Sequence, residues 1–255
     1  MNKGKKTDYI ILFFKIFPIA FVGFWVLTLI WVGIGVKQPI NHTPQMMLYN
    51  FSKSEDSLKY KVEHQWVSID SISQNLVTAV LASEDRNFFV HDGFSLKNDT
   101  DSIANNSQFL DNKTISQLTA DAVFLLNGKT WLHRINETYY TMMMEEFWGK
   151  NRILEVYLNS ALMGNGIFGA EAASHIYFDK KAGNLTKDEA AFIAAAMENP
   201  HKICLQNLSD SILLVRKNKI LQSMSLMMNV KVGKRPIDEP KNSFSRPVYR
   251  RKWRG

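Results

Sequence analysis

The sequence begins with a short polar segment, which is followed by a long run of apolar residues. From Ile16 to Val36 there are 21 residues without a charge, and Thr28 is the only clearly polar side chain among them. A helix of this length spans roughly 31 Å, close to the ~30 Å thickness of bilayer hydrocarbon. A core helix of a soluble protein would carry a polar face, which this run lacks. The pattern therefore predicts one transmembrane helix over residues 16–36.

Lysines that precede the apolar run predict its orientation: Lys3, Lys5, Lys6 and Lys15. The positive-inside rule keeps residues 1–15 in the cytoplasm and exports the chain that follows the helix. A cleaved signal peptide is the alternative, because Gly33 and Gly35 form a weak small-x-small site. The apolar run is longer than the usual signal-peptide core of about 7–15 residues, so we favour an uncleaved anchor.

Polar residues dominate the segment 37–61, which contains two prolines and a serine-rich run. This composition predicts a juxtamembrane linker. Helical spacing of apolar residues starts beyond it, in a set that ends at an acidic pair: Ile72, Leu76, Val77, Val80 and Leu81. Ser71 or Ser73 is available as its N-cap.

Further helices are predicted over 130–148 and 151–160, again from the spacing of apolar residues. A last helix is predicted over 210–229, before Gly233 and Pro236. Thr186 and Glu189 form a capping box that opens another helix, rich in alanine. The sequence contains no sustained alternation of the kind that long strands produce. Residues 62–229 are therefore predicted to form one mainly α-helical domain, followed by a tail over 230–255.

Charge is distributed unevenly along the 255 residues, and the net charge of +7 belongs to the tail. Residues 231–255 contain nine lysines and arginines against two acids, whereas basic and acidic residues balance in the rest of the chain. The body is therefore not expected to bind nucleic acid. The tail is expected to be either a solvated end or a segment that binds anionic lipid. The single cysteine, Cys204, excludes an intramolecular disulfide and a multi-cysteine zinc site.

An acidic pair stands out as candidate chemistry, because no metal or phosphate-binding motif is present. Glu84 and Asp85 end the predicted apolar helix, and Phe88 and Phe89 follow them. In a semi-apolar cleft one carboxyl would have a raised pKa and could exchange protons near neutral pH. The alternative is a solvated helix end whose acids contact nothing.

A second candidate lies in the predicted helix 130–148. Arg134 and Glu137 are three residues apart and are predicted to share a helix face. An exposed ion pair is one interpretation of this spacing. The other places a cation and an acid beside a charged leaving group.

Five segments, in order, resemble the peptidoglycan glycosyltransferase domain, and in particular the monofunctional biosynthetic transglycosylases of Gram-negative bacteria. They are SEDRNFFVHDGF, KTISQLTADAVFL, WLHRINETYY, WGKNRILEVYLNSALMGNGIFGAEAASHIYF and LTKDEAAFIAAAMENP. The resemblance covers about residues 65–225 and implies a lysozyme-like fold. It also implies a single-pass inner-membrane protein whose periplasmic domain polymerises lipid II into β-1,4 glycan strands and releases undecaprenyl diphosphate. Expected partners are lipid II, the nascent glycan strand, the membrane and other cell-wall synthesis proteins, but no nucleic acid.

Residue roles follow from this resemblance. Glu84 matches the general base that acts on the acceptor hydroxyl, and Glu137 matches the acid near the donor diphosphate. Substrate binding is expected of Asp85, His91, Thr114, Gln117, Arg134, Lys150 and Arg152, of which the last three could supply positive charge. No residue is assigned as a metal ligand and no cofactor is required, although a divalent cation could assist at the lipid diphosphate.

The second segment departs from the pattern that it resembles. Thr114 and Gln117 are retained, but four other positions are altered, with the residues Asp111, Lys113, Leu118 and Asp121. Asp121 stands where the family pattern has a lysine, which reverses the charge at a position expected to face phosphate. Lys113 is a candidate to restore a cation from nearby. His133 also stands where a cation is usual.

Three hypotheses remain open at this point. The first is an active lipid II polymerase, which the intact pair Glu84 and Glu137 favours. The second is a catalytically weak or inactive homologue that acts as an interaction partner in cell-wall synthesis, which the altered second segment favours. The third is a lysozyme-like hydrolase, against which the anchor and the five matching segments argue.

Overall fold

The computed structural model describes residues 3–51, 62–95, 113–126, 128, 130–200 and 211–227, with side chains from position 15 onward. The domain is mainly α-helical, as predicted. Its helices are α1 (Lys3–Gly35), α2 (Pro44–Phe51), α3 (Gln74–Glu84), α4 (Ile115–Phe124), α5 (Trp131–Phe147), α6 (Gly149–Ser160), α7 (Ala170–Phe178), α8 (Lys187–Met197) and α9 (Ser211–Leu226). The basic tail lies outside the described residues.

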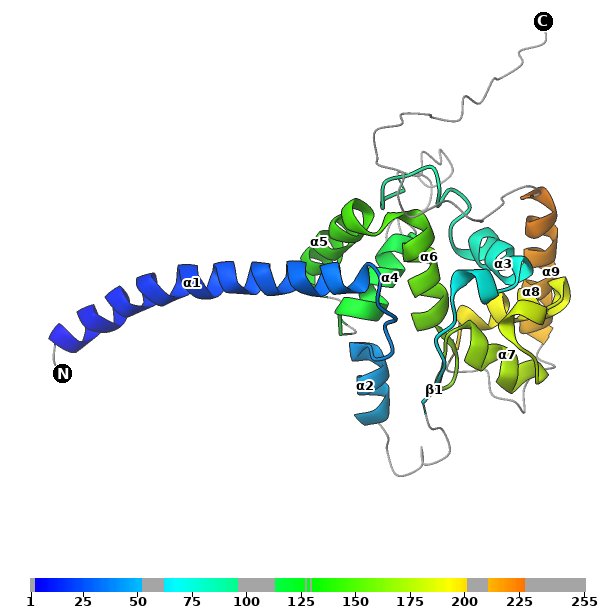
Figure 1. The fold of residues 1–255 in the computed structure, drawn as a ribbon, viewed down its shortest axis with the longest axis horizontal. Helices are drawn as coiled ribbons and strands as arrows, with labels where there is room; N and C mark the ends of the chain where they lie inside the picture. Colours follow the sequence, from blue (N-terminus) through cyan, green and yellow to red (C-terminus); the bar gives the residue numbers. More distant parts are fainter. Residues whose placement is uncertain are drawn as a thin grey trace, which may run out of the picture.

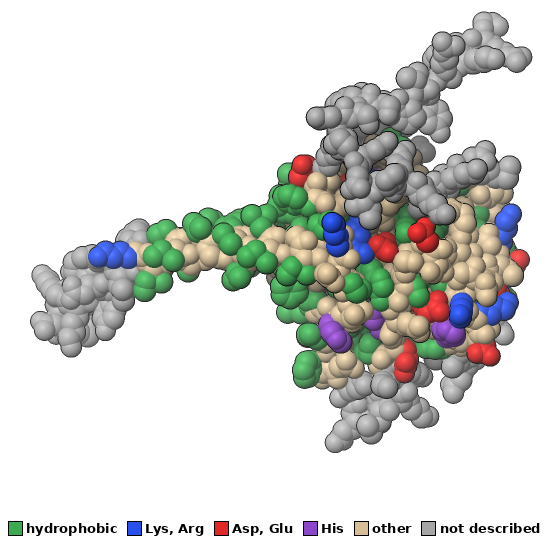
Figure 2. Space-filling model, in the orientation of Figure 1, with side chains coloured by type: hydrophobic (Ala, Val, Ile, Leu, Met, Phe, Trp, Pro, Cys, Tyr) green, Lys and Arg blue, Asp and Glu red, His purple; other side chains and the backbone are tan. Residues whose placement is uncertain are grey.

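Helix α1 projects away from the domain and touches it only near its C-terminal end (Figure 1). It starts at Lys3 and so extends further toward the N-terminus than the predicted span of 16–36. Its segment Lys15–Gly35 is long and apolar enough to cross a membrane. Apolar side chains are spread along the described part of this helix (Figure 2), which is compatible with the predicted single-pass anchor.

Contacts at the end of α1 join this helix to the domain. The indole nitrogen of Trp148 donates to the carbonyl of Val32 at 2.8 Å, and Arg152 Nε donates to the carbonyl of Gly35 at 3.0 Å. The hydroxyls of Thr28 and Tyr139 lie 2.9 Å apart. Because the last carbonyls of a helix have no partner within it, Trp148 and Arg152 supply partners that α1 lacks. The anchor is thereby held against α5 and α6.

Helix α2 lies within the segment that the sequence predicted to be a linker. The hydroxyl of Thr43 accepts from the amide of Met46 at 3.2 Å, and Pro44 occupies the first helical position. The side chain of Gln45 donates to the carbonyl of Asp121 in α4 at 3.1 Å. The predicted linker therefore contains a helix over residues 44–51 that the sequence did not predict. An eight-residue helix is too short for a clear apolar period, although threonine followed by proline is a start signal.

The remaining helices pack in two groups, with α4, α5 and α6 nearest the anchor and α3, α7, α8 and α9 beyond them (Figure 1). The predicted caps are present: Ser73 accepts from the amide of Asn75, and Thr186 forms a capping box with Glu189. Helix α3 buries the apolar side chains that predicted it, except that Ile72 is buried just before the helix starts, and α8 buries all five of its alanines. The two groups meet where Asp85, after α3, accepts from the amide of Ile115 in α4, and where α6 contacts α7.

A small sheet completes the domain. Its strands β1 (Glu63–His64), β2 (Leu162–Gly164) and β3 (Ile167–Phe168) lie in the order β1-β3-β2. β1 runs parallel to β3, and β2 runs antiparallel to it. Strands of two or three residues cannot show alternation, which explains why the sequence did not predict them.

Glycine at position 169 is required where β3 turns into α7. Gly169 has φ +86° and ψ 161°, a conformation almost confined to glycine. A Cβ there would lie 2.5 Å from the backbone oxygen of Asn159. We expect Gly169→Ala to lower the free energy of unfolding by about 3 kcal/mol or more, because strain and overlap add.

The matched control is Gly149→Ala. Gly149 has φ +71°, but a Cβ there would meet nothing within 4 Å, so only about 1 kcal/mol should be lost. Thermal or denaturant unfolding of both variants measures the difference. Equal losses would contradict the packing described here.

Candidate active site

Glu84 is the last residue of α3 and lies at the junction of the two helix groups. Burial raises the pKa of its carboxyl to about 7, and the negative charges of Glu198 and Asp85 act in the same direction. The buried phenol of Tyr157 is close enough for the charge of Glu84 to contribute to its raised pKa, after the larger effect of burial. Glu84 therefore agrees with the predicted semi-apolar carboxyl and not with a solvated helix end.

Asp85 has a different environment from its neighbour. Its buried carboxylate accepts from His91 Nε2 at 2.8 Å and from the amide of Ile115, the first residue of α4, at 3.2 Å. His91 Nδ1 accepts from the amide of Gly93 at 3.1 Å, so the ring proton resides on Nε2 and points at Asp85. Asp85 and His91, predicted to bind substrate, thus tie the end of α3 to the start of α4.

Thr114 and Gln117 form the N-terminal cap of α4. The amide of Gln117 donates to the hydroxyl of Thr114 at 3.2 Å, and the amide of Thr114 donates to the side chain of Gln117 at 3.1 Å. The side-chain nitrogen of Gln117 also donates to Glu137 Oε1 at 3.0 Å. The two retained residues of the second segment therefore shape α4 and orient an acid of α5.

Glu137 is buried in α5 and has a charged partner. Lys113 Nζ donates to Glu137 Oε2 at 2.8 Å and also contacts the carboxylate of Asp121. Burial of Lys113 opposes its charge, but the hydrogen bonds to these two acids outweigh burial and raise its pKa. The expectation that Lys113 supplies a nearby cation agrees with this arrangement, because its ammonium lies between both carboxylates.

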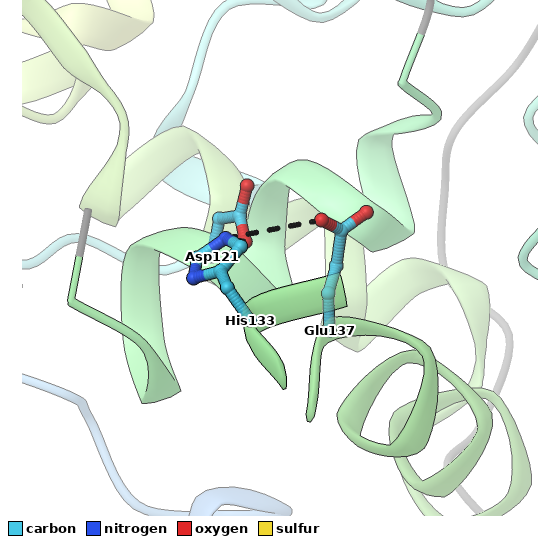
Figure 3. Close-up of side chains that lie close together, drawn as sticks. All are labelled: Asp121, His133 and Glu137. Atoms are coloured by element: carbon cyan, nitrogen blue, oxygen red, sulfur yellow. Dashed lines mark ion pairs between the residues drawn. The ribbon is translucent and has the colours of Figure 1, made fainter. Parts of the chain in front are cut away.

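His133 completes this group of side chains (Figure 3). Its Nε2 lies 3.0 Å from Asp121 Oδ1 and 4.0 Å from Glu137 Oε2. The imidazole and the two carboxylates point toward one another from α4 and α5. Asp121 and His133, two positions at which the sequence departs from the pattern that it resembles, are therefore in contact.

Within the described structure, the three basic residues predicted to bind substrate, Arg134, Lys150 and Arg152, do not pair with Glu84 or Glu137. Arg134 is exposed although Glu137 is buried, since a step of three residues turns the side chain by about 60° away from the buried stripe. Lys150 Nζ pairs with Glu145 at 2.7 Å and lies 4.5 Å from the ring centroid of Phe88. Among the described residues, neither forms an ion pair with Glu84 or Glu137.

Arg152 lies at the anchor junction. It donates to backbone carbonyls at the end of α1, pairs with Glu155 at 2.6 Å and stacks 5.1 Å from the ring centroid of Trp66. These contacts account for the side chain without a substrate. Its predicted part in substrate binding stays a prediction, as do those of Arg134 and Lys150.

Glu198 was not predicted from the sequence. It follows α8, is exposed and pairs with Arg216 at 2.9 Å, and its charge raises the pKa of Glu84. Helix α8 packs against α3, which brings the two acids near each other. No local pattern connects positions that are more than a hundred residues apart, so only the tertiary structure reveals this neighbour.

Comparison with known proteins gives consistent matches over the domain. A family model described as Transglycosylase matches residues 52–225. A "Biosynthetic peptidoglycan transglycosylase" of Mannheimia succiniciproducens is 44% identical over 176 residues, which cover 67% of this chain and 71% of that protein. Proteins with the same description from Bacteroides thetaiotaomicron and Acinetobacter baylyi are each 36% identical, covering 85% and 80% of this chain and 88% and 92% of theirs.

The raised pKa of Glu84 predicts how the free energy of unfolding depends on pH. The pKa is about 7 in the folded chain against 4.5 as the reference, so the folded state favours the protonated carboxyl. Stability associated with this proton is fully present below pH 4.5 and is lost as the pH rises through 7. Glu84→Gln is neutral at every pH. It should therefore exceed the wild type in free energy of unfolding by at most about 3 kcal/mol at alkaline pH, and by little in acid.

Unfolding measured at acidic and alkaline pH tests this difference. Glu63→Gln is the control, because Glu63 is an exposed glutamate of β1. The control should show no pH-dependent gain over the wild type. A Glu84→Gln variant that behaves like this control would show that Glu84 is solvated.

Proposed function

Because the chain belongs to the transglycosylase family, we propose that it polymerises lipid II into β-1,4-linked glycan strands and releases undecaprenyl diphosphate. The family makes the chain a peptidoglycan glycosyltransferase of cell-wall synthesis. Its mainly α-helical domain is consistent with the lysozyme-like fold class expected from the sequence. The observation that carries the proposal is the pair of acids Glu84 and Glu137, of which Glu137 is buried and Glu84, half-buried, has a pKa of about 7.

Glu84 supplies the base in the proposed mechanism. A general base works best when its pKa lies near the operating pH, and a value of about 7 meets this condition. Its carboxylate takes the proton from the acceptor 4-hydroxyl as the oxygen attacks the anomeric carbon of the donor. The new bond forms on the face opposite the departing diphosphate. An α-linked diphosphate therefore gives a β-linked product, which makes the reaction inverting.

Glu137 and its partners lie on the proposed leaving-group side. Lys113 Nζ is held by Glu137 and Asp121, and its side chain is 33% exposed. A partly exposed ammonium of this kind can stabilise negative charge that develops on the diphosphate. Glu137 keeps this cation in place, and Gln117 fixes the other carboxylate oxygen of Glu137. This arrangement supports a second segment that still binds the diphosphate, with Lys113 as its cation, over an inactive segment.

The anchor fits a substrate that remains in the bilayer. Helix α1 packs against α5, where the side chains of Leu132, Ile135 and Met142 are exposed. We assign the chain to the bacterial inner membrane, with residues 1–15 in the cytoplasm and the domain in the periplasm, because basic residues precede the apolar helix. An undecaprenyl tail would then lie in the same membrane as α1. Contacts with other cell-wall synthesis proteins stay a prediction.

Glu84→Gln is expected to reduce polymerisation by at least about 100-fold, since it removes the general base and keeps the shape of the side chain. The measurement uses the full chain in detergent with labelled lipid II, and the products are separated on a gel. Glu63→Gln, at an exposed position, is the control and should polymerise like the wild type.

Each outcome of this assay separates the hypotheses. Polymer from the wild type and the control, but not from Glu84→Gln, supports the proposal. Unchanged lipid II with the wild type would indicate an inactive homologue. Breakdown of preformed glycan strands would indicate a hydrolase, and full activity of Glu84→Gln would place the base elsewhere.

A further inference from the structure

A cluster of three potential metal ligands lies beside the proposed leaving-group site. Asp121 comes from α4, and His133 and Glu137 come from successive turns of α5 (Figure 3). One ligand atom from each side chain lies within 4.8 Å of the others. Among the described residues, no other group of this kind is found.

One oxygen of this cluster lacks the hydrogen bond that its burial demands. Asp121 Oδ1 is buried and accepts no hydrogen bond from any described residue, although His133 Nε2 lies 3.0 Å away. Adjacent ligands of an octahedral cation with bonds of about 2.1 Å are separated by roughly 3.0 Å. The two atoms therefore have the spacing of neighbouring ligands of one ion, in a geometry unsuited to a hydrogen bond.

The net charge of the cluster also favours binding of a cation. Two carboxylates, Asp121 and Glu137, face one ammonium, that of Lys113. With a neutral imidazole the group carries one uncompensated negative charge, and the side chains of His133, Asp121 and Glu137 are only 11%, 17% and 7% exposed. Uncompensated charge at low exposure is costly, so a further positive charge would stabilise the site.

We propose that Asp121, His133 and Glu137 bind a divalent cation of the Mn²⁺ or Mg²⁺ type. Two carboxylates with one imidazole suit such an ion, and three protein ligands leave coordination positions for phosphate oxygens. Lys113 Nζ contacts both carboxylates of the cluster, and its partly exposed side chain would move outward when the ion binds. The role of the ion at the lipid diphosphate rests on the proposed function, whereas its binding does not.

The experiment titrates Mn²⁺ into the full chain in detergent, without lipid II, and measures free Mn²⁺ by electron paramagnetic resonance. The wild type should bind one Mn²⁺ per chain. Asp121→Asn and His133→Gln should each weaken binding by about tenfold or more, because each removes a ligand. Lys113→Gln should tighten it, because a competing cation is removed.

His175→Gln is the matched control. His175 pairs with Glu171 at 3.1 Å with the same spacing of four residues, but without a third ligand. This variant should bind Mn²⁺ like the wild type, and thermal unfolding checks that every variant is folded. The result that overturns the proposal is the absence of saturable binding in the wild type, or binding that Asp121→Asn leaves unchanged.

Since the titration contains no substrate, its failure leaves the polymerase proposal intact. Conversely, a chain that binds Mn²⁺ at Asp121 and His133 but does not polymerise lipid II would keep the site and overturn the function. If His133 is instead protonated, it supplies the positive charge itself. Nuclear magnetic resonance of the imidazole would then show the protonated form, and Mn²⁺ would not bind.

Discussion

The buried carboxylate of Asp85 is the contact on which the rest of the site depends. It ends α3 and accepts from the first amide of α4, a group that has no partner within its own helix. His91 supplies a second donor. This one side chain therefore sets the position of α4 relative to α3. Through Gln117 in α4 it also sets the position of Glu137 relative to Glu84.

Two neighbouring acids have different tasks because their surroundings differ. Asp85 accepts from two donors, which suits a carboxylate that joins two helices. Glu84 is desolvated and faces the charges of Asp85 and Glu198, so its proton is held until about pH 7. The same contrast separates Glu84 from Glu137, which Lys113 and Gln117 compensate. The structure thus provides one acid with a raised pKa beside acids that are held by hydrogen bonds.

Local signals predicted much of the fold correctly. The caps of α3 and α8 and the apolar anchor are encoded within a few residues, and so they could be found without tertiary information. Helices α2, α4 and α7 and the three strands were not predicted, and these helices, of 8, 10 and 9 residues, and the still shorter strands are too short to show a clear period. Glu84, Asp85 and Glu137 were named from the sequence as candidate site residues, and Lys113 was expected to supply a cation.

Partners that depend on packing could not be predicted in the same way. Arg134 was expected to face Glu137, but it lies outside the buried stripe of α5. Arg152 contacts the end of α1, which is distant in sequence. Glu198 reaches the environment of Glu84 only because α8 packs on α3. The contact between Asp121 and His133 likewise joins two helices, and no motif spacing indicates it.

The central claim is that burial and nearby acids make Glu84 a base that titrates near neutral pH. The most direct measurement is the rate of lipid II polymerisation as a function of pH, for the wild type and for Glu198→Gln. The wild-type rate should rise with pH through about 7, as the carboxyl of Glu84 loses its proton. The same rise should occur at lower pH in the variant, because one repelling charge is gone. A rate that does not rise with pH in the wild type, or a profile that Glu198→Gln leaves unchanged, would contradict the account.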